Sequence, residues 1–417
     1  MKIKDITARE ILNAKGNPAV EATVVLQDGS TGIASCPQGT SVGSYEAAEV
    51  RDHDMTRFYG NGMLKAVNTV THVIAKDLIG MDATKQREID KRMIELDGTQ
   101  NKSKLGVNAI LPVSMAVAKA ASASEHLPLF RYLHSFLGEK SVAEKMPTPL
   151  FNIVNGGAHA MNTFDFQEFI IIPATFKTFE QCIHMGTGLY HALRDFLLSN
   201  GLSTLVGDEG GFAPVLSTNY DGLSLLTQAI ETTNRRIGFD VFFGIDAASN
   251  NFYRDRVYHI KDRGSELTAK AMNDFYETLL KEFKILYLED ILSEDDWDGW
   301  KDAMSRLAEG ALIVGDDLVA TNPYRLQMAI NKQAINAVVV KPNQIGTVIE
   351  SLALVDVARA AGLKVIVSHR SGETNDDFIA DFAVAVAADY AKFGAPARGE
   401  RIAKYNRLLA IASLLER

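Results

Sequence analysis

Residues 338–347 read VVVKPNQIGT, an apolar run that ends on a lysine followed directly by a proline. The valines predict a buried strand, because short β-branched runs bounded by turn residues are typical of strands covered on both faces. The residue before a proline is held extended, so we expect Lys341 to continue the direction of the strand. Pro342 lacks an N–H, but at a strand end no ladder hydrogen bond need be lost.

Similar apolar runs alternate with longer helical segments through the C-terminal part of the chain. They are LFNIV (150–154), FIIIP (169–173), VFFGID (241–246), ILYLED (285–290), ALIVGD (311–316) and KVIVSH (364–369). Strands that alternate with helices indicate parallel βα units, and their number favours a closed barrel over an open sheet. A doubly wound sheet is the alternative, but no GxGxxG motif follows a first strand. The insert NFYRDRVYHIKD (251–262) predicts a hairpin between two of these units.

The N-terminal part has a different pattern. Residues 1–35 predict antiparallel strands, with a hairpin turn at DGS (28–30), and residues from about 44 to 125 predict helices despite Pro112. A charged, proline-containing stretch at 138–149 marks the boundary. We therefore predict an α/β protein, with an N-terminal α+β domain at 1–138 and a C-terminal TIM-like β/α barrel at 139–417.

Five of the apolar runs end on polar side chains: Asp246, Glu289, Asp316, Lys341 and His369. The carboxyl ends of barrel strands open onto one face, which holds the active site, so these groups should converge there. Three converging carboxylates repel one another unless a cation lies between them, and all-oxygen ligands suit Mg²⁺. The alternative is that each carboxylate caps a helix, as we expect for Asp290 and Asp317.

Lys341 is either the partner of a neighbouring acid or a general base. A base must be neutral, so its pKa must fall, which a nearby metal ion and a second cation can achieve. In SHRSGET (368–374), the side chains of His369, Arg370 and Ser371 are donors suited to a phosphate group. The alternative for this stretch is a polar turn.

The composition narrows the class of protein. A net charge of −9 argues against a general nucleic-acid binder. The two cysteines, Cys36 and Cys182, lie far apart in the sequence and favour a reducing compartment. The N-terminal residues do not resemble a signal peptide, and the apolar runs are shorter than a membrane helix requires. We expect a cytoplasmic protein without a membrane span.

Several motifs, in this order and spacing, together resemble the enolase family of phosphopyruvate hydratases. They are GNPAVEATV (16–24), DGTQNKSKLGVNAI (97–110), NGGAHA (155–160), QEF (167–169), GDEGG (207–211), WDGW (297–300), VKPNQIGT (340–347), SHRSGET (368–374) and RIAKYNRLL (401–409). The resemblance implies an enolase-type barrel that begins with two strands and two helices. It also implies the reversible, Mg²⁺-dependent dehydration of 2-phospho-D-glycerate to phosphoenolpyruvate in glycolysis.

The resemblance also implies roles for individual residues. Asp246, Glu289 and Asp316 match the ligands of one Mg²⁺, and Ser41 matches the loop serine that meets a second. Lys341 matches the catalytic base and Glu209 the catalytic acid, whose pKa we expect Glu168 to raise through like-charge repulsion. Lys392, in YAKFG, matches the lysine on the substrate carboxylate. The expected substrate contacts are His159, Glu168, Glu289, Asp316, His369, Arg370, Ser371 and Lys392.

Some positions depart from the family pattern, among them Gln38, Val42, Ile291 and Pro342. These departures leave two alternatives open within the resemblance: a paralogue acting on a phosphonate analogue, like carboxyphosphonoenolpyruvate synthase, and a non-catalytic surface-binding protein. GTSVG (39–43) fits the GxSxG motif of serine hydrolases, but it follows a predicted antiparallel region. By resemblance we also expect a homodimer or a larger homo-oligomer, and a secondary pool at the cell surface is a further expectation.

Overall fold

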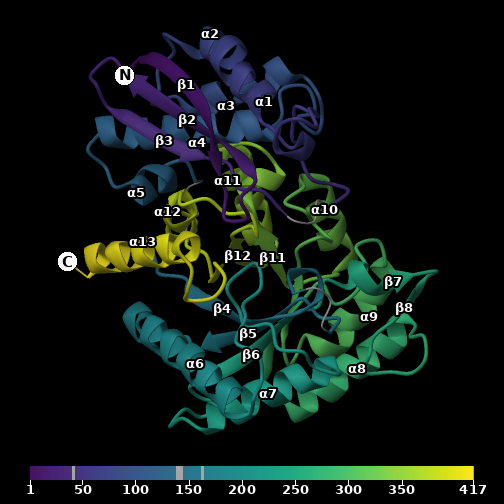
Figure 1. The fold of residues 1–417 in the computed structure, drawn as a ribbon. Coiled ribbons are helices and arrows are strands. Elements are labelled where there is room, and N and C mark those ends of the chain that lie inside the picture. The colour runs from purple at the N-terminus through teal and green to yellow at the C-terminus, as the bar shows by residue number, and fades with distance from the viewer. Residues whose placement is uncertain (40–42, 138–143, 161–163, 417) are drawn as a thin grey trace.

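The computed structural model describes residues 1–39, 43–137, 144–160 and 164–416. A three-stranded sheet and its helices stand at the top of Figure 1, and a larger barrel surrounded by helices lies below them. The predicted domain boundary at 138/139 and Ser41 both lie outside the described residues.

The N-terminal sheet has the order β1-β2-β3 and is antiparallel throughout, as predicted. Its strands are β1 (Ile3–Leu12), β2 (Pro18–Leu26) and β3 (Thr31–Ser35). Gly32 lets the long helix α4 approach this sheet closely, because a Cβ there would lie 2.0 Å from the carbonyl oxygen of Ala116. The glycine therefore fixes how near the helix can pack.

The helices of this domain begin later than predicted. They are α1 (Leu64–Thr69), a π-helical turn (Val70–Ile74), α2 (Ala75–Leu78), α3 (Gln86–Asp97), α4 (Val107–Ser124) and α5 (Leu129–His134), after a 3₁₀ turn at Phe58–Gly60. The helix prediction was wrong for the stretch before this turn. Ala47 donates its N–H to the carbonyl of Gln344, and Ala48 donates to that of Asn101. These amides bond to other segments, so they are not available for a local helix.

Helix α4 carries Pro112 in its interior and is the central apolar element of the N-terminal domain. Among the described residues it is the one helix long and apolar enough to cross a membrane, yet 83% of it is buried inside the protein. Its apolar side chains therefore belong to the core that joins this helix to the sheet.

The barrel is closed and contains eight strands in the order β4-β5-β6-β9-β10-β11-β12-β13. Their bounds are β4 (Thr148–Asn155), β5 (Glu168–Pro173), β6 (Val241–Asp246), β9 (Ile285–Glu289), β10 (Leu312–Gly315), β11 (Ala337–Val340), β12 (Lys364–Ser368) and β13 (Tyr390–Lys392). Strand β5 runs antiparallel to both neighbours, and the other pairs are parallel. The predicted closed barrel is confirmed.

Helices pack around the barrel. They are α6 (Phe179–Ser199), α7 (Asn219–Glu231), α8 (Ala269–Glu282), α9 (Trp297–Leu307), α10 (Pro323–Lys332), α11 (Val348–Ala360), α12 (Phe378–Ala385) and α13 (Gly399–Leu415). Two strands and two helices come first, as the resemblance implied. The predicted inserted hairpin is formed by β7 (Tyr253–Arg254) and β8 (Val257–Tyr258). Short 3₁₀ turns occur at Gly157–His159, Ser249–Phe252 and Pro342–Gln344.

Side chains alternate between two cores along the barrel strands. In β11, Val339 lies in the barrel interior with residues such as Tyr287 and Ile366. Val338 and Val340 instead belong to the larger core that includes the surrounding helices. Because both faces of the strand are buried, its sequence is continuously apolar rather than alternating.

A buried polar joint connects the two domains. The N-terminus of α11 receives its partners from the N-terminal domain: Val348 donates its N–H to Ser114 Oγ, and Ile349 donates to Asp90 Oδ2, both at 3.0 Å. Ser114 and Gln86 also donate to Asp90 Oδ1. Burial raises the pKa of Asp90 to about 7. The joint therefore holds the N-terminal domain against the barrel through an ionisable group.

Candidate active site

A cavity of about 370 Å³ lies at the mouth of the barrel. It is lined by the ends of the barrel strands and by Gly39, Gly43, Ser44 and Glu46 of the N-terminal domain. Four of the strand-end residues that the sequence predicted to converge line this cavity: Asp246, Asp316, Lys341 and His369. The fifth, Glu289, is fully buried next to it, with its carboxylate 2.8 Å from the ammonium group of Lys392. The lining also includes His159, Glu168, Glu209, Arg370, Ser371 and Lys392.

Lys392 lies among three buried carboxylates. Its Nζ is 3.0 Å from Glu168 Oε2, 3.0 Å from Asp246 Oδ2 and 2.8 Å from Glu289 Oε2. The Tyr287 hydroxyl donates to the same Glu289 oxygen at 2.5 Å. Burial, and then repulsion from Asp246, raises the pKa of Glu289 to about 8. One ammonium group thus faces more negative charge than it can neutralise.

The acidic side chains around this point form two overlapping groups whose ligand atoms lie within 4.8 Å of one another. The groups are Asp246, Glu289 and Asp290, and Asp290, Asp316 and Asp317. Glu289 Oε1 and Asp316 Oδ1 are buried and have no hydrogen-bond partner among the described residues. Buried carboxylate oxygens without a partner are costly unless a cation meets them. The donor set therefore fits a divalent metal ion.

Asp290 has a different task from its neighbours. Its Oδ1 accepts the N–H of Asp316 at 3.0 Å, and its Oδ2 accepts the N–H of Asp317 at 2.8 Å. We had expected Asp290 to cap a helix. Instead, it holds the end of β10 beside the end of β9. This contact positions Asp316, and periodicity alone gives no signal for it.

Lys341 stands at the end of β11 with extended backbone angles, φ −128° and ψ 105°, as the following proline predicts. Its ammonium pairs with the carboxylate of Asp316. Burial, Arg370 and Lys392 each act to lower the pKa of Lys341, but the carboxylates of Asp316 and Glu289 act to raise it, and the pKa lies above its ordinary value. The predicted fall in this pKa relied on a nearby metal ion as well as a second cation, so it stays a prediction, and the close approach of Asp316 acts against it.

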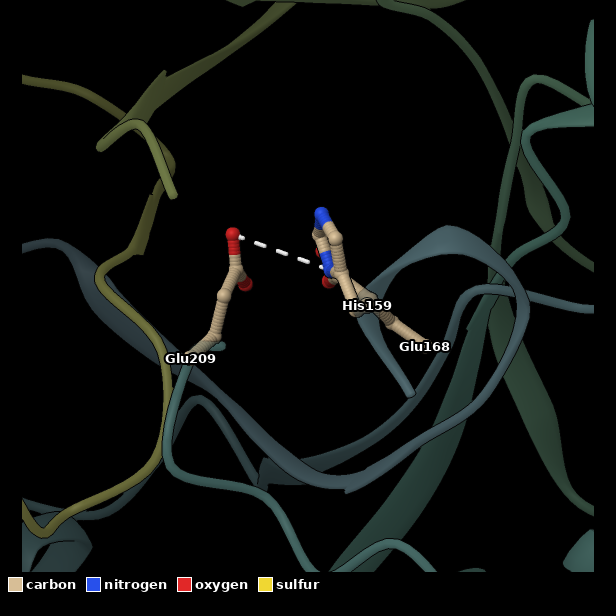
Figure 2. A group of neighbouring side chains, drawn as sticks. All are labelled: His159, Glu168 and Glu209. Atoms are coloured by element: carbon tan, nitrogen blue, oxygen red, sulfur yellow. Dashed lines mark ion pairs between the residues drawn. The ribbon is translucent and has the colours of Figure 1, made fainter. Parts of the chain in front are cut away.

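His159, Glu168 and Glu209 face one another in Figure 2. His159 Nδ1 lies 3.6 Å from Glu168 Oε1 and 3.9 Å from Glu209 Oε1. Figure 2 also shows that Glu168 and Glu209 reach this point from separate segments of backbone. A buried histidine thus stands between two carboxyl groups, an arrangement suited to holding a proton.

The predicted rise in the Glu209 pKa was wrong. Burial acts to raise it, but His369, His159 and Arg401 together act to lower it, and the pKa of Glu209 lies well below its ordinary value. His369 Nε2 and Asn152 Nδ2 both contact Glu209 Oε2, at 3.1 and 3.0 Å. Burial, and then the charge of Glu209, instead raises the pKa of Glu168 well above its ordinary value.

Arg370 is held by a residue that the sequence reasoning did not identify. Its guanidinium lies 2.8 and 3.1 Å from the two carboxylate oxygens of Glu46, and 3.1 Å from Asn343 Oδ1. Glu46 belongs to the N-terminal domain, so no strand-end pattern could identify it. Ser371 lines the same cavity. The strand before GTSVG is β3 of the antiparallel sheet, which does not fit the parallel-strand elbow of a serine hydrolase.

Comparison with known proteins agrees with this geometry. The family model described as the enolase N-terminal domain matches residues 3–133, and the one described as the enolase C-terminal TIM barrel domain matches residues 143–416. A protein described as enolase, from Acidothermus cellulolyticus (strain ATCC 43068 / DSM 8971 / 11B), is 49% identical over 414 residues, which is 99% of this chain and 95% of that protein. The chain belongs to the enolase family.

Proposed function

We propose that the protein is a phosphopyruvate hydratase that reversibly dehydrates 2-phospho-D-glycerate to phosphoenolpyruvate in glycolysis. The observation that carries this proposal is that one cavity is lined by Lys341, Lys392, acidic side chains that fit a metal ion, and the Glu168–Glu209 pair. The reaction removes a proton next to a carboxylate and expels a hydroxyl group from the neighbouring carbon. It therefore needs a base, an acid and a strong source of positive charge.

Lys341 is the proposed base that removes the C2 proton. Burial, Arg370 and Lys392 lower its pKa, whereas Asp316 raises it. The charge on Asp316 is therefore one of the factors that set how readily Lys341 accepts a proton. Pro342 keeps the preceding backbone extended, which aims the amine toward the cavity.

Asp246, Glu289 and Asp316 would hold one Mg²⁺, and Ser41 would contribute to a second. The ions would supply the positive charge that stabilises a doubly charged substrate carboxylate. Lys392 adds a fixed cation on the same group. Its position, between Glu168, Asp246 and Glu289, is fixed by contacts of 2.8 to 3.0 Å.

Glu209 is the proposed acid, and Glu168 acts with it. The two carboxyl groups meet at His159. Repulsion between them favours a pair that carries a proton, and Glu168 is the member with the raised pKa. We propose that this pair, rather than Glu209 alone, supplies the proton that the leaving hydroxyl group takes.

Arg370 and Ser371 are the proposed contacts for the substrate phosphate, beside His369. Arg370 presents a planar donor pair to Glu46, and a phosphate group could take the same two bonds. Binding would then require the substrate to compete with a carboxylate from the N-terminal domain. This competition would couple the phosphate site to the segment that contains Ser44 and Glu46.

We also propose that the chain forms at least a homodimer in the cytoplasm, with a secondary pool at the cell surface. Leu12 and Ile33 of the N-terminal sheet are 61% and 49% exposed, which offers an apolar surface to a neighbour. Both cysteines are buried free thiols, which suits a reducing compartment.

The activity test compares two substrates with and without metal. With Mg²⁺, the protein should convert 2-phosphoglycerate to phosphoenolpyruvate, and excess EDTA should abolish turnover. A phosphonate analogue should react more slowly. Turnover of the phosphonate alone would support the paralogue instead, and full activity in EDTA would contradict the proposed metal-assisted mechanism.

A further inference from the structure

Arg401 of helix α13 is completely buried beside the proposed acid. Its Nη1 lies 2.7 Å from His369 Nδ1 and 2.6 Å from the carbonyl oxygen of Arg370. Its Nη2 donates to the carbonyl oxygen of Ser371 at 2.6 Å and to that of Asp208 at 3.2 Å. One guanidinium therefore joins the loop that carries His369 to the loop that carries Glu209.

These contacts determine which nitrogen of His369 carries its hydrogen. A guanidinium has only N–H donors, so the ring nitrogen facing it, Nδ1, must accept. The hydrogen of the neutral ring must then lie on Nε2, which is 3.1 Å from Glu209 Oε2. Burial, with a further contribution from Arg401, lowers the pKa of His369 to about 4, so the ring is neutral near pH 7.

The tautomer makes the two oxygens of Glu209 unequal. Oε2 accepts hydrogen bonds from both His369 Nε2 and Asn152 Nδ2. A proton on Oε2 would compete with these two N–H groups for the same lone pairs. Oε1 is the oxygen nearer to His159, at 3.9 Å from Nδ1 (Figure 2). When Glu209 is protonated, its hydrogen therefore belongs on Oε1.

We propose that Arg401 is a positioning residue that fixes the tautomer of His369 and thereby selects Oε1 of Glu209 as the oxygen that donates the proton. This proposal rests on the dehydration proposed above. In that step the bond between C3 and its hydroxyl oxygen breaks, and the electron pair stays on the oxygen. The oxygen takes the Oε1 proton and leaves as water. Glu209 remains as a carboxylate stabilised by two N–H groups on Oε2.

The first test needs no variant of Arg401. Nitrogen NMR of the parent protein, labelled with ¹⁵N-histidine, should show His369 as the neutral tautomer with hydrogen on Nε2 between pH 6 and 8. The signal is assigned by its disappearance in His369→Gln. A ring with hydrogen on Nδ1, or a doubly protonated ring, would overturn the proposal whether or not the protein turns over 2-phosphoglycerate.

The second test asks whether Arg401 affects proton donation by Glu209 without affecting proton removal by Lys341. Arg401→Gln should lose the single tautomer and lower kcat for dehydration by about 10²-fold, the lower end of what a positioned acid contributes. KM should stay close to that of the parent, because Arg401 does not line the cavity. Exchange of the C2 proton with solvent should persist near the parent rate, because Lys341 is unchanged. If Arg401→Gln does not fold, Arg401→Lys, which keeps the buried charge but lacks the planar fork, takes its place.

Lys404 offers a matched control. It is also completely buried on α13, lies 2.9 Å from Glu373, and donates to the carbonyl oxygen of Thr374 at 3.0 Å. Lys404→Met should lower stability yet keep the His369 tautomer and the ratio of C2 exchange to dehydration. If it changes that ratio as the Arg401 variants do, the effect is general loosening and the proposal fails.

If the parent neither dehydrates nor exchanges 2-phosphoglycerate, the proposed function and the acid role of Glu209 fail together. The NMR experiment still decides the tautomer of His369.

Discussion

The ammonium group of Lys341 forms an ion pair with the carboxylate of Asp316 across the neighbouring strands β10 and β11. The same carboxylate belongs to the acidic group that fits a metal ion, and its Oδ1 has no partner among the described residues. Asp316 therefore stands between the proposed base and the proposed metal. Its charge sets how readily Lys341 gives up or accepts a proton.

The first prediction concerns Lys341 itself. Lys341→Ala should lower kcat by about 10²- to 10⁴-fold, as expected for a lost general base. KM should change little, because other residues contact the phosphate and carboxylate. Steady-state kinetics, with proton exchange at C2 followed by NMR in D₂O, would measure both effects. Exchange near the parent rate in this variant would show that Lys341 is not the base.

The second prediction concerns the metal ligand. Asp316→Asn removes one anionic ligand while keeping the shape of the side chain, so Mg²⁺ affinity measured by calorimetry should fall by at least about tenfold. The acidic limb of the kcat profile should also move to lower pH, because the group that raises the pKa of Lys341 is lost. Asp302→Asn, at a partly exposed ion pair with Arg306, is the control. Unchanged Mg²⁺ affinity in Asp316→Asn would exclude this carboxylate as a ligand.

The third prediction concerns Pro342, which begins a 3₁₀ turn directly after the base. Pro342→Val should reduce kcat only mildly, by less than about tenfold, because Lys341 remains at the end of the same strand and keeps its ion pair with Asp316. The amide nitrogen gained by the variant lies at the start of a helical turn, where a free N–H is tolerated. A loss of activity as large as that of Lys341→Ala would give the proline a role beyond holding the backbone.

The fourth prediction concerns the joint between the domains. Asp90 has a pKa of about 7 in the folded chain and 3.8 ordinarily, so between these values the folded chain binds more protons than the unfolded chain. The free energy of unfolding should therefore fall as pH rises through this window, by at most about 1.4 kcal/mol per pH unit from this one group. Asp90→Asn should flatten this dependence in urea titrations at pH 5, 6 and 7. An unaltered slope in the variant would assign the dependence to other groups.

The fifth prediction concerns assembly. Sedimentation should detect a species of at least twice the chain mass of 45.6 kDa. Replacing the exposed apolar side chains Leu12 and Ile33 with serine should shift the distribution toward the monomer, whereas replacing the exposed Phe176 at the far end of the barrel should not. A parent protein that sediments only as a monomer would contradict the proposed dimer.

The sequence was informative where side chains followed the parallel strands. Asp246, Glu289, Asp316 and Lys341 each follow a recognisable apolar run, and the barrel geometry brings such positions together. Lys392 was found only through resemblance, because β13 has three residues and is too short to form a pattern.

Other features depended on contacts that no local pattern records. Glu46 reaches Arg370 from the other domain, and Asp290 binds backbone amides of the adjacent strand. The expected pKa direction of Glu209 was wrong for the same reason, and the pKa of Lys341 likewise depends on its contact with Asp316. Each depends on which partner lies closest, which is a property of the folded chain rather than of its residue types.

The reversed direction of β5 has a consequence for how the site is assembled during folding. Because β5 runs opposite to its neighbours, its first residue, Glu168, reaches the mouth directly after the loop that carries His159. These two residues therefore meet across a short loop, whose closure costs little chain entropy. Glu209 and His369 are 160 residues apart in the chain, so their contact closes a far longer loop. We expect the contact between His159 and Glu168 to form early in folding. The contact between Glu209 and His369 should form only when the C-terminal helix has docked.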